Sequence, residues 1–198
     1  MSGAIFLEGN RMDNLFVGGN ASGGGGSQEP FIGSTGTQKI ALPFYSDEAI
    51  KVEFDLLQGS YEYNKVILGD IWSESGVVLY AYNALNSMRI TRSIDQTFTP
   101  NKWHWSHIEL DFTTGTLTVD GVEVVSAYQA HGHNQQYLFG LSGQNSCVGI
   151  KNFKVYKNDT LFLDFEPRED SVTGEGYFYD RVSGVDYRGD NPLVYGEN

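Results

Sequence analysis

Two carboxylates with the spacing of a strand are the first residues in the sequence that could do chemistry. Glu53 and Asp55 are separated by one residue, so in an extended strand both side chains point to the same face. Retaining glycoside hydrolysis uses a nucleophilic and an acidic carboxyl group about 5 to 5.5 Å apart. The strand continues with Leu57 and Gln58, which offer no further carboxylate. The pattern favours two solvent-facing carboxylates on an amphipathic strand over a catalytic pair.

A serine and the single cysteine are the candidate nucleophiles. Ser142 follows Gly140 as in a Gly-x-Ser-x-Gly elbow, but Gln144 stands where the last glycine belongs. Cys147 has no second cysteine with which to form an intrachain disulfide, and no histidine lies near it in sequence. We therefore expect Ser142 in a turn after a strand and Cys147 buried as a small hydrophobic side chain.

The histidines are the candidate metal ligands. His131 and His133 are close enough in sequence to share an ion, and His104 and His107 could add ligands. Zinc sites usually combine such histidines with cysteines or carboxylates at regular spacing, and the loop around His131 offers neither. The sequence favours a solvent-exposed loop there, and the metal ligands stay unknown.

Sugar binding requires exposed aromatic rings beside side chains that can bond hydroxyl groups. The chain contains 12 Tyr, 12 Phe and 3 Trp, and the same residue types fill the core of a β-sandwich. Trp103 and Trp105 are expected to pack in the structure. The candidate carbohydrate-binding residues are Trp72, Tyr80, Tyr82, Tyr128, His131 and His133.

Charge and the first residues exclude several classes of function. The formal net charge is −12, with 13 Lys and Arg against 25 Asp and Glu. Nucleic acids and anionic membrane surfaces are bound by clustered Lys and Arg, so neither is an expected partner. The sequence opens without a basic segment followed by a long apolar run, so we predict no signal peptide and no membrane insertion. Synthesis in a cytoplasm is expected.

Period-two alternation dominates the chain from about residue 38. It puts Ile50, Val52, Phe54 and Leu56 on one face of a strand, and it predicts a buried core face. Asp120-Gly121 between alternating runs predicts a tight type I′ hairpin. The expected strands lie at residues 50–56, 65–72, 76–82, 88–92, 105–112, 116–119, 122–125, 137–141, 148–156 and 160–165. No helix longer than about two turns is expected, so the prediction is an all-β sandwich or jelly roll.

Residues 1–27 read as a short N-terminal β arm with a glycine-rich linker at residues 18–27. Two similar apolar triplets could form a small hairpin, which is too small to fold alone and must dock on its own domain or on a neighbouring chain. An artificial linker is the rival interpretation of the glycines. Strand addition through the arm would make a homo-oligomer or a larger assembly. The assembly residues are Ile5, Phe6, Leu7, Leu15, Phe16 and Val17.

Three segments together resemble the LamG and pentraxin-like branch of the concanavalin A-like superfamily. They are residues 52–56 (VEFDL), residues 105–108 (WSHI) leading into residues 115–121 (GTLTVDG), and residues 150–156 (IKNFKVY). The resemblance implies a concanavalin A-like jelly-roll sandwich of two antiparallel sheets over residues 28–198. It also leaves Ca²⁺ open as a cofactor without assigning a ligand, because such domains often bind it on loop carboxylates.

Enzymes that share this fold carry an E-x-D-x-E or E-x-D-x-x-E strand. In this chain Leu57 and Gln58 occupy both places where the last glutamate would stand. The general acid is therefore missing, and we expect no enzyme.

A fourth segment is similar to the tail of LamG-like proteins from phages and prophages of gut bacteria. It comprises residues 163–168 (LDFEPR), residues 176–184 (GYFYDRVSG) and Tyr187. This resemblance implies a structural protein of the virion, in a head or tail fibre or as a capsid decoration, that displays its domain and binds glycans of the host surface. Its partners would be other virion proteins, reached through the arm. The alternative is a carbohydrate-binding LamG-like module of a bacterial surface protein.

Overall fold

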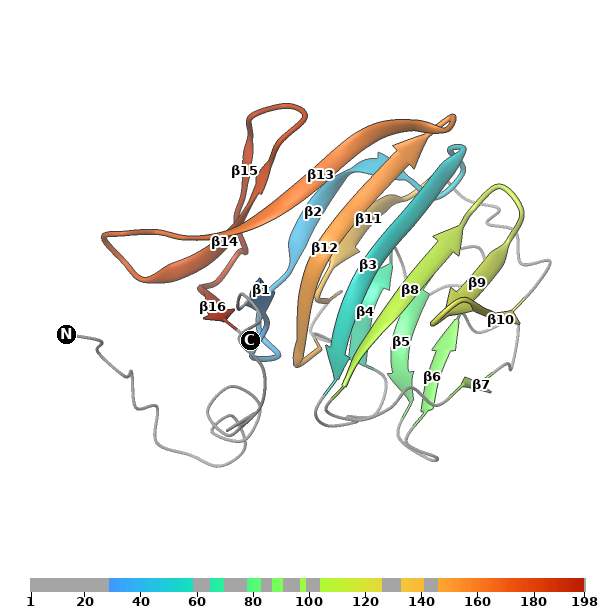
Figure 1. Ribbon diagram of the computed structural model, residues 1–198, viewed down its shortest axis with the longest axis horizontal. Coiled ribbons are helices and arrows are strands. Elements are labelled where there is room, and N and C mark those ends of the chain that lie inside the picture. Colours follow the sequence, from blue (N-terminus) through green and yellow to red (C-terminus); the bar gives the residue numbers. More distant parts are fainter. Residues whose placement is uncertain are drawn as a thin grey trace.

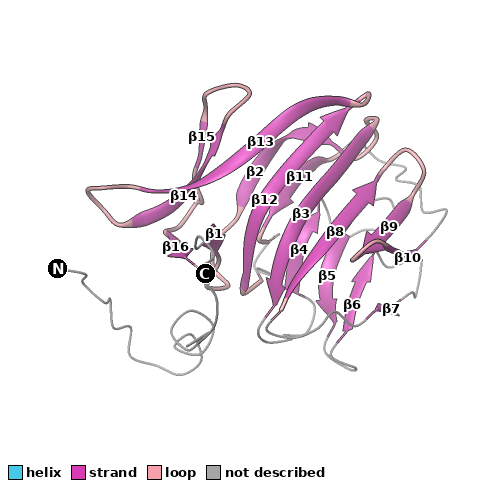
Figure 2. Ribbon diagram, viewed as in Figure 1, coloured by secondary structure: helices cyan, strands magenta, loops and turns pink. Residues whose placement is uncertain are grey.

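The computed structural model describes residues 29–58, 65–69, 78–82, 87–90, 97–98, 104–125, 133–140 and 146–197. Every regular element in these ranges is a β-strand, as Figure 2 shows. Within the same ranges no helix is long and apolar enough to cross a membrane. The strands form two antiparallel sheets that pack face to face, with β12, β3 and β8 over β11, β4, β5 and β6 in Figure 1.

The larger sheet contains ten strands in the order β1-β16-β14-β13-β12-β3-β8-β9-β10, with β15 paired to β14. Strand β1 also pairs with β12, so the strands β1, β16, β14, β13 and β12 form a closed ring at this end of the sheet. The strands are β1 (Pro30–Gly33), β3 (Ile50–Gln58), β8 (Trp105–Asp111), β9 (Thr116–Val119), β10 (Val122–Val125), β12 (Val148–Lys157), β13 (Thr160–Glu169), β14 (Glu175–Asp180), β15 (Asp186–Tyr187) and β16 (Leu193–Glu197).

The smaller sheet contains six strands in the order β2-β11-β4-β5-β6-β7. Strand β2 is therefore an edge strand whose only partner in the described sheet is β11. The strands are β2 (Ile40–Tyr45), β4 (Lys65–Gly69), β5 (Val78–Tyr82), β6 (Ser87–Ile90), β7 (Thr97–Phe98) and β11 (Gln135–Leu138).

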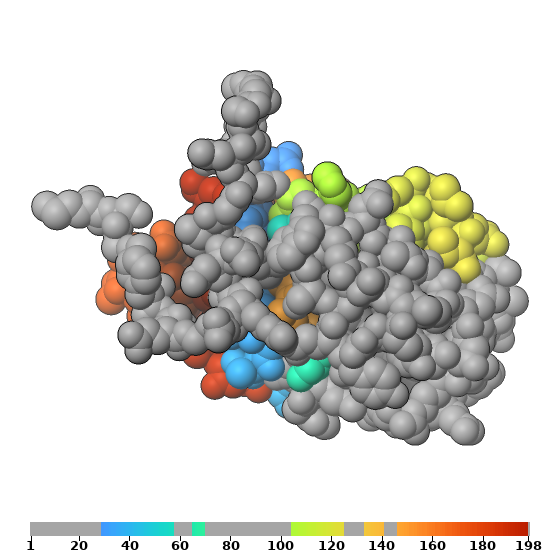
Figure 3. Space-filling view, turned by 90° about the horizontal axis from the view of Figure 1, so that it is seen from below, coloured from blue at the N-terminus to red at the C-terminus, as the bar shows by residue number. Residues whose placement is uncertain are grey.

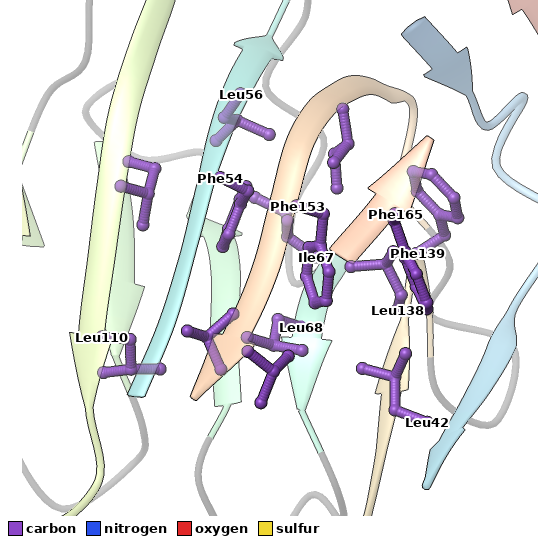
Figure 4. Close-up of a cluster of buried hydrophobic side chains, with 14 of the residues drawn as sticks. Leu42, Phe54, Leu56, Ile67, Leu68, Leu110, Leu138, Phe139, Phe153 and Phe165 are labelled. Carbon is purple, nitrogen blue, oxygen red and sulfur yellow. The ribbon is translucent and has the colours of Figure 1, made fainter. Parts of the chain in front are cut away.

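The core lies between the two sheets and is rich in phenylalanine (Figure 4). Phe165 stacks on Phe153 at a ring-centroid distance of 5.2 Å and on Phe178 at 5.1 Å. All three rings are almost fully buried. The three rings lie on neighbouring strands of the larger sheet, and a side chain of this size contributes about 1.5 to 3 kcal/mol when it is fully buried.

Two tight hairpins join neighbouring strands of the larger sheet. Asp120 and Gly121 have φ angles of 51° and 77°, which confirms the type I′ turn between β9 and β10. Figure 3 shows this hairpin, in yellow, uncovered at one end of the molecule, where Val122 is 63% exposed. Asn158 and Asp159 also have positive φ angles and form the turn between β12 and β13.

Several predicted strands are confirmed and others are corrected. The strands at residues 116–119 and 122–125 have the predicted bounds. The strand predicted at residues 137–141 is wrong in position, because β11 runs from Gln135 to Leu138. It ends there because Phe139 takes a φ of 69° and donates its backbone N–H to Ile67. Strands β14, β15 and β16 extend the sheet beyond the last strand that the sequence predicted, and Figure 1 shows β14 and β15 reaching past the smaller sheet.

Cys147 is half-buried, which corrects the expectation of a buried cysteine. Its neighbours Ser146 and Val148 are both 1% exposed. Since successive side chains alternate in extended chain, the cysteine points the other way. Ser142 and Gln144 lie outside the described residues, and so do residues 1–27 with all six predicted assembly residues.

Candidate functional site

An exposed pair of stacked rings lies where β2 ends and β11 begins. Strand β2 alternates between core and solvent, so Phe44 is buried while Tyr45 is 37% exposed. The His133 ring lies parallel to the Tyr45 ring, with 4.0 Å between centroids and 8° between planes. His133 Nδ1 is 2.7 Å from Asp47 Oδ1, so a carboxylate fixes the imidazole on the tyrosine.

Polar and aromatic side chains continue from this pair along the same two strands. Tyr45 is paired with Gln135, whose amide donates to the Leu42 carbonyl at 3.2 Å and accepts from the Tyr137 hydroxyl at 3.4 Å. Lys39 Nζ lies 5.5 Å from the centre of the Tyr137 ring. We call these six side chains the β2–β11 strip: Lys39, Tyr45, Asp47, His133, Gln135 and Tyr137.

Local hydrogen bonds hold the chain segments together at the Tyr45–His133 end of the strip. The Ser46 N–H donates to the Asn134 carbonyl at 3.0 Å, and the Asn134 N–H donates to the Ser46 hydroxyl at 3.3 Å. Glu48 accepts the Tyr45 N–H at 3.0 Å and pairs with Lys157 Nζ at 2.6 Å. Burial alone would raise the pKa of Glu48, but the bonds from Lys157 and Tyr45 hold it below its ordinary value. The turn that carries Asp47 is therefore fixed by a charged glutamate.

The strip offers the two kinds of contact that a sugar requires. The rings of Tyr45 and Tyr137 present apolar surface, and the His133 ring extends the first of them. A carboxylate, an amide and an ammonium group lie beside these rings and can bond hydroxyl groups as acceptors and donors. Because the rings lie on paired strands, their relative positions are set by the sheet.

The structure places one predicted sugar-binding residue, His133, in the strip. Tyr80 and Tyr82 lie on β5 of the same sheet, where Tyr80 is paired with Val66 and with Arg89. Trp72, Tyr128 and His131 lie outside the described residues.

Sequence reasoning missed the other members of the strip. The alternation of β2 shows its outward residues only once the inward set of Ile40, Leu42 and Phe44 is recognised. That signal was available for Tyr45. The pairing of β2 with β11 joins residues about ninety positions apart, and no local pattern indicates it.

A second cluster lies on the outer face of the larger sheet. Asp55 accepts from His107 through Nδ1 at 2.8 Å and from the Asn152 amide at 2.8 Å. Glu53 is 3.2 Å from Lys154 Nζ and accepts the Tyr156 hydroxyl at 2.9 Å. The prediction that Glu53 and Asp55 face away from the core is confirmed, but both are tied into a network in which their side chains are 18% and 20% exposed.

Nearby carboxylates favour the protonated form of the His107 imidazole. Burial would lower the pKa of its imidazole, but the hydrogen bond and charge of Asp55, together with the charges of Glu109 and Glu53, raise it above the ordinary value. His107 is on β8 of the larger sheet, whereas His133 precedes β11 of the smaller sheet. The suggestion that His104 and His107 add ligands to a site at His131 and His133 is therefore wrong for His107.

The prediction that Trp105 packs in the structure is confirmed. Its ring meets Phe31 edge-on at 5.5 Å, and Lys151 Nζ lies 4.5 Å from its centre. Trp103 lies outside the described residues.

Known proteins resemble this chain in fold but not in sequence. No family model matches the chain, and no curated protein matches its sequence. A proposed carbohydrate-binding protein from Bacteroides ovatus superposes with a TM-score of 0.60 at 12% identity, covering 86% of this chain. The chain spans about 60% of that protein. A heptameric SAP-like pentraxin from Limulus polyphemus superposes with a TM-score of 0.52 at 8% identity, covering 86% of this chain and 95% of the pentraxin.

These similarities establish the fold. The chain is a concanavalin A-like jelly-roll sandwich, as the sequence predicted. Identities of 8% and 12% carry no residue roles from one protein to another, and neither match connects the chain with a phage particle.

Proposed function

We propose that the protein is a glycan-binding module that holds its ligand on the β2–β11 strip. The observation that carries this proposal is the exposed parallel stack of Tyr45 and His133, fixed by Asp47 and continued by Gln135 and Tyr137. A jelly-roll fold shared with a proposed carbohydrate-binding protein supports it. The proposal covers binding alone and assigns no catalytic residue.

A glycan array probed with the full chain tests the proposal. We expect a glycan hit whose affinity falls at least about fivefold in Tyr45→Ala and in His133→Ala, because each variant removes one ring of the stack. Tyr177→Ala is the matched control. The Arg188 guanidinium lies 4.3 Å from the centre of the Tyr177 ring. Because Tyr177 is on β14, outside the strip, this variant should bind as the unmodified chain does.

Two results would overturn the proposal. One is an array on which no glycan is bound. The other is a hit that both strip variants bind with unchanged affinity, which would place the glycan elsewhere on the molecule.

The setting in which the module works is a separate proposal. We propose that residues 1–27 attach the domain to a phage particle, as the sequence resemblance implies, with glycan binding serving contact with the host. A LamG-like module of a bacterial surface protein is the alternative, and the structural matches do not distinguish the two settings, since neither match comes from a phage particle. Either setting uses the same strip.

A further inference from the structure

Three potential metal ligands converge on the outer face of the larger sheet. Oxygens of Glu53 and Glu109 and a ring nitrogen of His107 all lie within 4.8 Å of one another. Zinc–ligand bonds of about 2.0 to 2.2 Å place the ligand atoms of one ion roughly 3 to 4 Å apart. Small side-chain adjustments would therefore bring the three groups onto a single ion.

Strand pairing fixes these groups. In the register of β3 with β8, Glu53 lies directly opposite Glu109, and Asp55 lies directly opposite His107. Directly opposite residues of an antiparallel pair have Cβ atoms about 4.5 to 5.5 Å apart, so the four side chains occupy neighbouring positions on one face. All four belong to regular strands, which hold a site more firmly than loops do.

Asp55 fixes the orientation of the His107 ring. It engages His107 Nδ1 at 2.8 Å, and this leaves Nε2 directed at Glu109, 3.5 Å from its Oε1. Histidines that bind metal commonly bond a carboxylate through the other ring nitrogen, which fixes the tautomer and the ring plane. Asp55 is therefore a positioning residue for His107.

We propose that Glu53, His107 and Glu109 form a binding site for a divalent transition-metal ion of the Zn²⁺ class. One imidazole nitrogen with two carboxylate oxygens suits zinc and its neighbours better than Ca²⁺, which prefers six to eight oxygen ligands. The side chains of His107 and Glu109 are 42% and 36% exposed, so an ion can reach them from solvent. Three protein ligands leave further coordination positions for water or for a ligand group.

Cationic side chains lie beside the carboxylates of the proposed site. Lys154 lies 3.2 Å from Glu53, and Lys51 lies 3.7 Å from Glu109. Both lysines are on the sheet surface with long flexible side chains, so they can turn aside when the ion supplies the positive charge. The site is on the sheet opposite the β2–β11 strip and does not depend on glycan binding.

Isothermal titration of the full chain with Zn²⁺ alone, at pH 7.5 in a non-chelating buffer, tests the site. We expect one Zn²⁺ per chain and an affinity at least tenfold weaker in His107→Ala and in Glu109→Gln. Asp55→Asn should weaken binding by about tenfold or more through the loss of orientation. His133→Ala is the matched control, because His133 also pairs with an aspartate but lacks the two glutamates, and its affinity should stay within twofold.

A second measurement keeps the test independent of small changes in folding. Co²⁺ bound to the full chain should give a visible absorption band with nitrogen ligation, and His107→Ala should lose that band while keeping the far-UV spectrum of a β protein. The proposal is overturned if Zn²⁺ shows no saturable binding, if His107→Ala binds as the unmodified chain does, or if Ca²⁺ at equal concentration displaces Zn²⁺.

Discussion

Asp180 shows how a single buried carboxylate can organise a turn. It is fully buried and accepts the N–H groups of Asp164 at 2.9 Å, Val182 at 3.1 Å and Ser183 at 3.0 Å, as well as the Ser183 hydroxyl. These bonds tie the end of β14 to β13 and to the loop that leads to β15. Loss of the charge would leave several buried donors without a strong acceptor.

Asp180→Asn is therefore expected to lower the free energy of unfolding by about 2 to 4 kcal/mol, as measured by urea denaturation. Asp170→Asn is the control, because Asp170 accepts the Val172 and Thr173 N–H groups in a similar but exposed turn. Its cost should stay below about 1 kcal/mol. Equal losses in the two variants would contradict the role given to burial.

Asp180 is also expected to contribute to the loss of stability at acidic pH. Burial would raise the pKa of Asp180, but the bonds from Asp164, Ser183 and Val182 lower it below the ordinary value of 3.8. A lowered folded-state pKa gives stability that is present above pH 3.8 and is lost as the pH falls through the folded-state value. Between pH 5 and pH 2 the unmodified chain should therefore lose more stability than Asp180→Asn, and equal slopes would contradict this.

The seam between β1 and β16 depends on a glycine, which has no side chain. Phe31 is paired with Gly196, and a Cβ at position 196 would overlap the Phe31 ring. On the other side of β1, a Cβ at Gly149 would lie 3.2 Å from Phe31 and 3.4 Å from Trp105, which is tight but tolerable. Phe31 therefore fills the space that the two glycines leave.

We expect Gly196→Ala to cost about 1 to 3 kcal/mol of stability and to loosen β16. Limited proteolysis should then trim the C-terminal strand faster than in the unmodified chain. Gly149→Ala is the graded comparison and should have a smaller effect on both readouts. If Gly149→Ala proves the more damaging change, the close packing of Phe31 against Gly196 does not control this seam.

Elements with regular alternation could be predicted from the sequence, whereas the C-terminal strands could not. β9 and β10 flank an Asp-Gly turn and have the expected bounds. β14 also alternates, but its buried positions are Gly176, Phe178 and Asp180, so its hydrophobic pattern is broken where a glycine and a bonded carboxylate replace apolar side chains. The packing of these three residues in the folded protein accounts for β14, whereas their residue types did not predict a strand.

The candidate site could be predicted only in part for a related reason. His133 was identified by its residue type, but its stacking partner Tyr45 depends on the pairing of β2 with β11. The outer-face group of Glu53, His107 and Glu109 likewise forms only through the register of β3 with β8. Spacing within one strand showed the carboxylates but could not show what lies opposite them.

The two proposed sites lie on opposite outer faces of the sandwich, one on each sheet. A glycan and a metal ion could therefore be bound at the same time without contact. The shared core separates them with a layer of buried side chains.

The assembly role of residues 1–27 is tested by light scattering of the full chain beside a variant that lacks them. We expect only the full chain to be oligomeric, because strand addition through the arm needs residues such as Leu15 and Phe16. The described fold begins at residue 29, so the shortened variant keeps every strand that the structure describes. If the full chain and the shortened variant are both monomers, residues 1–27 do not drive self-assembly.

The antiparallel pairing of β1 with β16 also determines how the domain responds to mechanical load. Pro30 is paired with Glu197, so the outer ends of the two strands meet at one corner. A pulling force applied to those ends opens the pair like a zipper and breaks one rung at a time, instead of shearing the whole ladder at once. A force that pulls Pro30 away from Glu197 would therefore open the β1–β16 pair first, while β1 stays paired with β12 and β16 stays paired with β14.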